Sequence, residues 1–219
     1  MTDSTKASEK LKNYLERDAN FLQVYEYTKK RFEEATHLTA HNWEHIYRDT
    51  INAIVIGGAE GADMGIVLPA IVCHDIGFLY GATGQTHGAV GADKLSEFLN
   101  DAGALYSQEI VKNIADCIRT HKGSMHNEKP ESLEAKVVAD ADLLQKFGPF
   151  GVYQHIRTFT EFNLPLTVIL KRAEETAMLT LETETGKNLA ESGRQYVVDF
   201  YRALREANKP YETPDNGVV

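Results

Sequence analysis

The sequence predicts a nearly all-helical fold, and two observations support this prediction. Apolar residues recur at helical spacing along almost the whole chain. No stretch shows the sustained alternation of apolar and polar residues, bounded by hairpin turns, that is typical of strands. The chain of 219 residues is long enough to bury a sizeable core in one domain. We therefore expect one all-α domain over residues 1–207 and a mobile polar tail over residues 208–219.

The expected helices follow from the periodicity and from residues that start or stop helices. Pro149 and Pro165 suit first helical turns, and Gly61 and Gly103 suit helix ends. Pro69 predicts a kink in its helix or a later helix start. The predicted helices cover residues 9–34 with a break near Asp18, 43–56, 64–78, 88–101, 107–121, 132–146, 149–160, 165–183 and 189–206.

Composition and charge exclude several classes of protein. Lys and Arg together number 23 against 32 Asp and Glu, so the formal net charge is -9 with the histidines neutral. This balance argues against sequence-independent binding to nucleic acid, which needs clustered basic residues, but it allows a small phosphorylated ligand beside a metal ion. There is no apolar core of signal-peptide length and no run of about 18 apolar residues. We therefore expect a cytoplasmic protein that does not contact membranes, with Cys73 and Cys117 reduced and buried.

Residues that can bind metals gather between positions 41 and 142. The stretch AIVCHDIGF places His74 and Asp75 directly after an apolar run, which predicts that a buried helix carries them. The C-terminal part of the chain supplies nothing comparable. The other residues of this type are His41 and His45 in HNWEH, His87 in GQTHGA, His121 in RTHKG, and Asp140 and Asp142 in VADADLL.

Spacing and chemistry narrow the roles of these residues. Asp140 and Asp142 are two apart and cannot both face one partner helix squarely, so one is expected to bind a metal and the other to support it or cap a helix. Imidazole and carboxylate ligands without a cysteine cluster suit Mn, Fe, Ni, Co or Zn. An aspartate has two oxygens, so Asp75 can bridge two ions.

The order of these residues resembles the HD superfamily of metal-dependent phosphohydrolases, in which His is followed by His-Asp and then by Asp. The matching residues here are His45, His74, Asp75 and Asp142. The strings HNWEHIYRD, LPAIVCHDIGF and VVADADLLQKFG are similar to a bacterial and archaeal branch whose final aspartate lies in a DADxL motif. This selects Asp142 and leaves Asp140 as a supporting residue. His87 and His121 stand where two-metal branches carry further histidines.

The resemblance implies an HD-domain helical bundle with a ligand-bearing core of about residues 41–150, an N-terminal helical extension and additional C-terminal helices. It implies hydrolysis of a phosphate ester of a nucleotide or similar small metabolite by a metal-bound hydroxide, with His74 and Asp75 at the centre of catalysis. One or two divalent transition-metal ions would bind per chain. The expected division is His45, His74 and Asp142 for one ion, His87 and His121 for the other, and Asp75 shared.

Further residues are expected to contact the ligands or the substrate. Lys122, Lys146 and Arg119 would neutralise phosphate oxygens, although lysine and arginine on helix faces are ordinarily just solvated. His41 is expected to be a hydrogen-bond partner, a substrate contact or a helix cap. The apolar C-terminal helices would suit a homodimer.

Three other interpretations remain open from the sequence. HNWEH also fits the inverted zinc-protease motif HxxEH, but that role would leave His74, Asp75, His87, His121 and Asp142 unused. An HD-type di-iron oxygenase that cleaves a C–H or C–P bond would use the same six ligands. A nucleotide-sensing binding module would keep the metal site without turnover, although the complete ligand set argues against lost catalysis.

Overall fold

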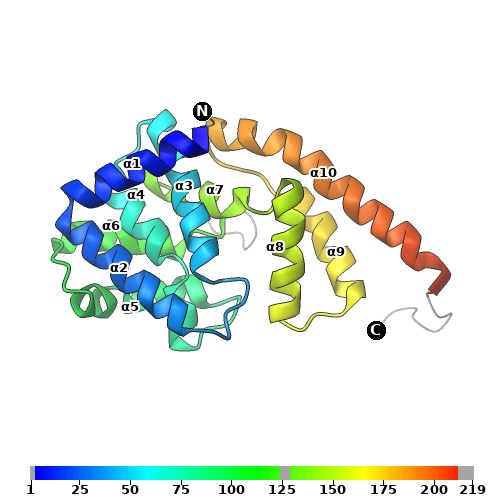
Figure 1. Cartoon of the computed structure of the whole chain (residues 1–219), viewed down its shortest axis with the longest axis horizontal. Helices are drawn as coiled ribbons and strands as arrows, with labels where there is room; N and C mark the ends of the chain where they lie inside the picture. The colour runs from blue at the N-terminus through cyan, green and yellow to red at the C-terminus, as the bar shows by residue number, and fades with distance from the viewer. Residues whose placement is uncertain (1–2, 124–128, 212–219) are drawn as a thin grey trace.

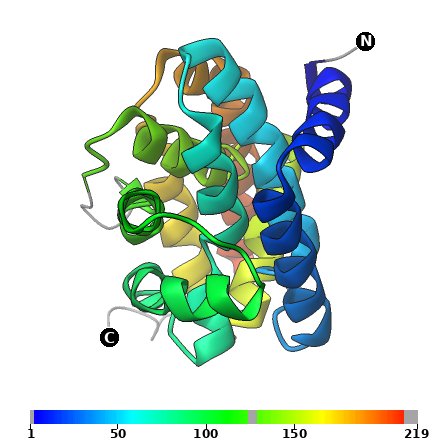
Figure 2. The same ribbon diagram turned by 90° about the vertical axis from the view of Figure 1, so that its left-hand side faces the viewer.

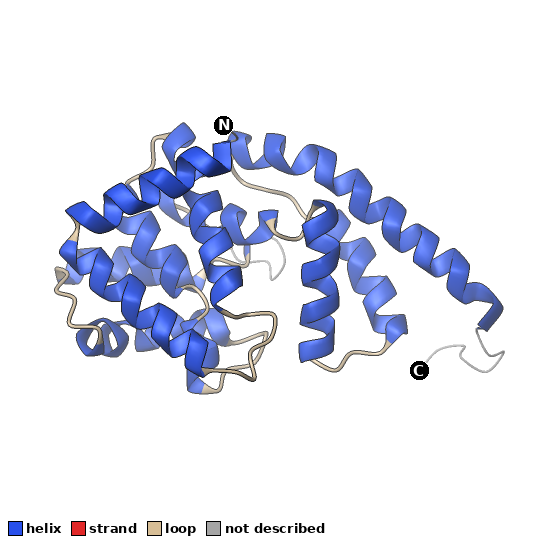
Figure 3. Ribbon diagram, viewed as in Figure 1, coloured by secondary structure: helices blue, strands red, loops and turns tan. Residues whose placement is uncertain are grey.

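The structure, a computed structural model, describes residues 3–123 and 129–211. Within these ranges the chain forms ten α-helices, joined by loops and short 3-10 turns, and no strand (Figure 3). The all-α prediction is confirmed. No helix in this part of the chain is both long and apolar enough to cross a lipid bilayer.

The first two helices form the expected N-terminal extension. Helices α1 (Asp3–Arg17) and α2 (Ala19–Glu34) are separated by Asp18, whose side chain accepts a hydrogen bond from the Phe21 N–H at 3.0 Å. Aspartate at this position satisfies one of the free backbone donors at a helix start. The predicted break near Asp18 is therefore confirmed. The two helices pack against α3 and α4.

Helices α3 and α4 carry the centre of the molecule. Helix α3 (Trp43–Glu60) begins after the cap Asn42 and ends at Gly61, whose φ of 76° is the left-handed conformation that glycine adopts without strain. Helix α4 (Met64–Cys73) is buried from Ile66 onward. It begins at Met64, so Pro69 lies inside the helix and does not mark a later start.

The predicted end of this helix at Phe78 is wrong. Helix α4 ends at Cys73, and the chain turns through His74 and Asp75 into the 3-10 helix η1 (Ile76–Tyr80). Asp75, with φ of -102° and ψ of 5°, has left the helical conformation. The residues around the turn are all buried, so the hydrophobic pattern gives no sign of where the helix ends.

The remaining helices follow the predicted order. The last helix begins at Glu184, before the predicted start at Leu189. Thr183 explains this earlier start, because its side chain caps the helix by accepting a hydrogen bond from the Gly186 N–H at 2.9 Å. The preceding helix ends at Ala177, short of the predicted Thr183. The bounds are α5 (His87–Asp101), α6 (Gln108–Arg119), α7 (Leu133–Leu144), α8 (Gly148–Glu161), α9 (Leu166–Ala177) and α10 (Glu184–Asn208).

The helices form a main bundle and a smaller C-terminal group. Helices α1 to α7 surround one hydrophobic core, and α4 lies inside it with α2, α3, α6 and α7 around it (Figures 1 and 2). Helices α8 to α10 lie beside the bundle around two smaller apolar clusters, one centred on Val197 and Tyr201 and the other on Phe147 and Leu181. The long helix α10 contacts both groups, because it packs on α8 and α9 and also touches α3 and α7.

Asp140 of α7 joins these two groups. Its buried carboxylate accepts hydrogen bonds from the Glu182 N–H at 2.8 Å, from the Thr183 N–H at 2.7 Å and from the Thr183 hydroxyl at 2.6 Å. Burial raises the pKa of Asp140, and these three donors oppose the rise. Asp140 therefore fixes the start of α10 on the core.

The C-terminal end of the chain is helical up to Tyr211. Helix α10 ends at Asn208, and Lys209–Tyr211 form a 3-10 turn. The rest of the predicted tail, residues 212–219, lies outside the described residues.

We predict that Asp140→Ala lowers the free energy of unfolding by about 2–3 kcal/mol, because three buried donors lose their acceptor. Urea denaturation followed by circular dichroism measures this change. Asp93→Ala is the control, since it removes an exposed ion pair with Arg119 and is expected to leave the midpoint in place. Equal effects of the two substitutions would contradict the role assigned to Asp140.

Candidate metal centre

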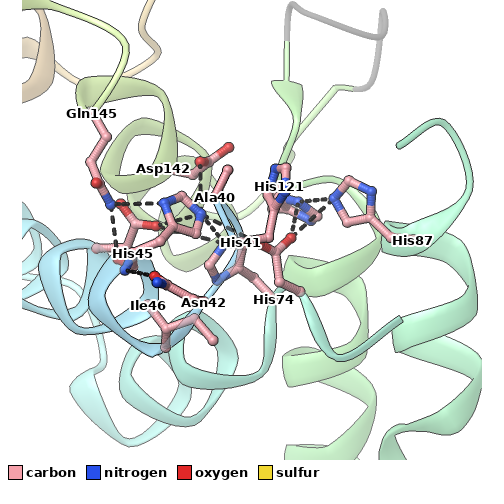
Figure 4. Close-up of polar contacts among 12 residues, drawn as sticks. Ala40, His41, Asn42, His45, Ile46, His74, His87, His121, Asp142 and Gln145 are labelled. Carbon is pink, nitrogen blue, oxygen red and sulfur yellow. Dashed lines mark hydrogen bonds and ion pairs between the residues drawn. The ribbon is translucent and has the colours of Figure 1, made fainter. Parts of the chain in front are cut away.

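Five helices bring six predicted ligand residues to one buried place (Figure 4). All six residues are at most 6% exposed. His45 lies in the first turn of α3, His74 and Asp75 follow α4, His87 begins α5, His121 follows α6, and Asp142 lies in α7.

Contacts between ring nitrogen Nδ1 and backbone carbonyl groups orient three of the imidazoles. His74 Nδ1 donates to the Ile71 carbonyl at 2.7 Å, and His121 Nδ1 donates to the Ile118 carbonyl at 2.6 Å. His87 Nδ1 faces the Thr83 carbonyl at 3.3 Å. A backbone acceptor on Nδ1 leaves the lone pair on Nε2, which is the arrangement that metal-binding histidines use. All three Nε2 atoms point into the cluster.

The Asp75 carboxylate lies between two pairs of histidines. Its Oδ2 is 3.3 Å from His45 Nε2 and 3.4 Å from His74 Nε2. Its Oδ1 is 3.1 Å from His87 Nε2 and 3.8 Å from His121 Nε2. Each oxygen of Asp75 therefore faces a different pair, as the expected division between two ions requires.

One further carboxylate belongs to this centre, and the sequence analysis did not identify it. Asp49 lies one turn after His45 in α3, is fully buried, and places Oδ2 3.2 Å from His45 Nε2. The signal for it was the spacing of four in HIYRD, which puts two helical side chains on one face. Potential donor atoms of His45, Asp49, His74 and Asp142 all lie within 4.8 Å of one another; we call these four residues the first cluster.

The second cluster consists of His87 and His121 around Asp75 Oδ1. The Nε2 atoms of the two histidines are 3.1 Å apart. The two clusters adjoin, because donor atoms of His74, Asp75 and His121 also lie within 4.8 Å of one another.

The electrostatics of the centre suit a bound cation. Burial raises the pKa of Asp49 to about 6. Burial alone would lower the pKa of His74, but the neighbouring Asp75 carboxylate outweighs this effect and raises the pKa to about 10. Excess negative charge thus draws protons onto the histidines of the first cluster when no cation is bound. Asp49 Oδ2 and Asp75 Oδ2 are buried and accept no hydrogen bond from the described residues. Unpaired carboxylate oxygens facing imidazole nitrogens fit a divalent metal ion.

The second cluster favours neutral imidazoles. Burial lowers the pKa of His121 well below its usual value, and the neighbouring His87 lowers it further. Burial also lowers the pKa of His87, although Asp75 opposes this. Neutral histidines are the form that binds metals, so no proton has to leave before an ion binds here.

The other predicted site residues lie in different places. Lys146 pairs with both oxygens of Asp142 at 3.2 Å, and Lys122 donates to the Gly84 carbonyl; both line a cavity of about 750 Å³ over the centre. Arg119 is half-exposed, pairs with Asp93 at 2.6 Å and does not line this cavity. Asp140 binds the start of α10 and does not join either cluster.

His41 lies at the edge of the centre and precedes helix α3. Its Nδ1 is 2.5 Å from Glu161 Oε1, and Glu161 Oε2 also accepts a hydrogen bond from the Ala40 N–H at 2.6 Å. Burial opposes ionisation of Glu161, but its hydrogen bond with His41 lowers the pKa of the carboxyl overall. Since Glu161 is the last residue of α8, this pair links the C-terminal helices to the ligand-bearing bundle.

The far wall of the cavity comes from α8, α9 and the loop between them. Gln154, His155, Phe159 and Phe162 contribute to this wall. His155 is 5% exposed, and burial lowers its pKa to about 3. Neither ring nitrogen of His155 nor Oε1 of Gln154 has a hydrogen-bond partner in the described part of the chain. The sequence analysis assigned no role to these polar groups.

Part of this chain matches a known protein family. Residues 42–146 match the family model of the HD domain. None of the curated proteins searched matches the chain.

Several solved structures share the fold. A predicted HD superfamily hydrolase from an uncultured Thermotogales bacterium is 24% identical, with 90% of this chain and 98% of that chain covered and a TM-score of 0.62. A protein from Lactobacillus plantarum is 19% identical over 88% of this chain and 98% of that one, with a TM-score of 0.73. Bacillus subtilis YpgQ, solved in complex with ADP, is 20% identical over 85% and 97%, with a TM-score of 0.60.

We predict that Gly77→Ala displaces His87 and removes one bound ion per chain. A Cβ atom at Gly77 would lie 2.7 Å from His87 Cα and still closer to its carbonyl oxygen, so the backbone at the start of α5 must move. Metal content measured by mass spectrometry on folded protein tests this. Gly58→Ala in α3 is the matched control, because its nearest neighbour would be Lys10 Nζ at 3.7 Å. An unchanged ion count in Gly77→Ala would refute the prediction.

Proposed function

We propose that the chain is a metal-dependent phosphohydrolase whose HD domain is formed by residues 42–146, the part that matches the family model. The proposed substrate is a phosphate ester of a nucleotide or of a similar small metabolite. His45, His74 and Asp142 would hold one ion, His87 and His121 a second ion, and Asp75 would contribute one oxygen to each.

The position of Asp75 is the observation that supports this proposal most strongly. A carboxylate whose two oxygens face two pairs of imidazoles can hold two ions side by side, as in hydrolases that act on phosphate esters. Ions bound there would lower the pKa of water to about 7 and supply hydroxide at neutral pH. Burial of the ligands keeps bulk water away from the centre, which strengthens the electrostatic interactions within it.

The cavity above the centre supplies groups for the rest of a substrate. Lys122 and Lys146 give its metal-facing side positive charge, which suits phosphate oxygens. Phe159 and Phe162 give the opposite wall aromatic surface, and Gln154 and His155 add polar atoms. A cavity of about 750 Å³ is large enough for an organic group attached to the phosphate. The ADP complex of YpgQ, a protein with the same fold, supports nucleotides as the first substrates to test.

A di-iron oxygenase is the second candidate function, because the position of Asp75 between two pairs of histidines would suit two iron ions as well. Imidazole and carboxylate ligands without cysteine suit a pair of iron ions as well as a pair of manganese ions. The two functions therefore differ in metal and substrate, and the ligand geometry is common to both.

The decisive test combines metal content, a visible absorption spectrum in air and a phosphate-release screen of nucleotides. The hydrolase predicts manganese, nickel, cobalt or zinc, or colourless protein, together with phosphate release that chelator abolishes and added metal restores. Two irons per chain with a ferric absorption band, oxygen uptake and no phosphate release would instead establish the oxygenase. No bound metal and no turnover would refute both.

We predict that Asp75→Ala reduces phosphate release by at least about 1,000-fold, since losing the shared ligand removes several kcal/mol of stabilisation from the transition state. The metal content should fall in parallel, while the far-UV circular dichroism spectrum stays that of the wild type. An Asp75→Ala protein that keeps its metal and its activity would overturn the mechanism. Arg119→Ala serves as the control, because Arg119 lies away from the cavity.

A further inference from the structure

We propose that Asp49 is a direct ligand of the ion held by His45, His74 and Asp142, so that the two ion positions differ in charge and openness. This inference rests on the proposed two-ion centre and adds a ligand that the order His, His-Asp, Asp does not contain.

The environment of Asp49 leaves one of its oxygens available. Gln145 donates a hydrogen bond to Asp49 Oδ1, which fixes the plane of the carboxylate. The other oxygen, Oδ2, is 3.2 Å from His45 Nε2 and 3.7 Å from His74 Nε2 and accepts no hydrogen bond from the described residues. The side chain is 0% exposed, so water does not solvate this charge. A buried carboxylate with a free oxygen needs a cation or a proton nearby.

The spacing of the donor atoms fits coordination. Donors about 2.1 Å from one ion lie about 3.0 Å apart at neighbouring positions of an octahedron and about 4.2 Å apart at opposite positions. Asp49 Oδ2 lies at 3.2 and 3.7 Å from the two imidazole nitrogens, and His45 Nε2 lies 3.7 Å from Asp142 Oδ1. The separation of 3.2 Å is close to the value for neighbouring positions, and the two separations of 3.7 Å lie between the two values.

A simple hydrogen bond between Asp49 and His45 is the competing explanation. It would occupy His45 Nε2, the nitrogen that also faces Asp75 and His74. An imidazole nitrogen that donates a proton cannot bind a metal at the same time. With an ion present, coordination by both residues uses the same atoms without this conflict.

The consequence is that the two ions are unequal. The first position would have two imidazoles and three carboxylates, those of Asp49, Asp142 and the shared Asp75, so protein groups fill most of its coordination shell. Such an oxygen-rich set favours six-coordinate ions such as Mn²⁺ over tetrahedral Zn²⁺. The second position would have two imidazoles and Asp75 alone. It would therefore exchange its ion more readily and keep places free for water and for the substrate phosphate.

The experiment is Mn²⁺ titration by calorimetry on the full chain, without substrate, for the wild type and for Asp49→Asn. Asparagine keeps the size of the side chain and an oxygen for Gln145 but loses the charge. We expect one tight and one weak ion in the wild type. In Asp49→Asn the affinity of the tight ion should fall by at least about 10-fold, and its preference for Mn²⁺ over Zn²⁺ should decrease.

Two further variants identify the position. The double variant His87→Ala/His121→Ala should bind the tight ion alone, and adding Asp49→Asn to it should weaken that ion. Asp140→Asn is the matched control, since it neutralises a buried aspartate that belongs to neither cluster, and its Mn²⁺ affinity should equal that of the wild type.

Each outcome decides between the inference and the proposed function. Wild-type protein that binds two ions while Asp49→Asn binds them equally well would overturn the role of Asp49 and leave the hydrolase in place. Wild-type protein that binds no divalent ion would overturn both. If Asp49→Asn does not fold, a crystal of the wild type soaked in Mn²⁺ gives the answer, because an ion out of bonding distance of Asp49 Oδ2 would overturn the inference.

Discussion

The buried carboxylate of Asp75 is the constraint on which the rest of the site depends. Removing a carboxylate from water costs several kcal/mol unless positive charge compensates for it. Here the compensation must come from four histidines or from ions that they hold, since two of them face each oxygen. Helices α3 to α6, or the residues directly after them, each bring an imidazole nitrogen within 4 Å of this one side chain. Helix α4 can occupy the centre of the bundle because it is apolar on every side and turns only after Cys73.

The bundle and the C-terminal helices contribute different parts of the site. The proposed metal ligands all come from residues 45–142, within the part of the chain that matches the HD-domain family model, whereas α8, α9 and the loop between them form the opposite wall of the cavity. Two contacts hold these parts together close to the centre: the pair of His41 with Glu161, and the hydrogen bonds from Asp140 to the start of α10. In the proposed function, the ligand-bearing part would determine which ions bind, and the C-terminal helices would determine which organic group fits beside the phosphate.

The two clusters also differ in properties that matter for the proposed two-metal hydrolase. The first cluster is rich in negative charge and offers more protein ligands, which would suit an ion that stays bound. The second cluster has histidines that burial keeps neutral and fewer ligands, so it suits an ion that meets the substrate. Lys146 offsets some of the negative charge by pairing with Asp142, and it also borders the cavity where a phosphate would enter.

The sequence by itself determined the all-α class and the order of the helices, because helical periodicity can be read without the fold. The order His45, His74–Asp75, Asp142 and its resemblance to the HD superfamily also predicted the six residues that meet in the candidate centre. Only the tertiary structure decided four other matters. It ended α4 at Cys73 inside a continuous apolar run, it separated Asp140 from Asp142 by turning one to α10 and the other to the candidate metal centre, and it left Arg119 on the surface. It also brought Asp49 into the centre. A buried carboxylate one turn from a histidine looks in sequence like any solvated helical aspartate, and its place in the centre appears only when α4 and α7 pack against α3.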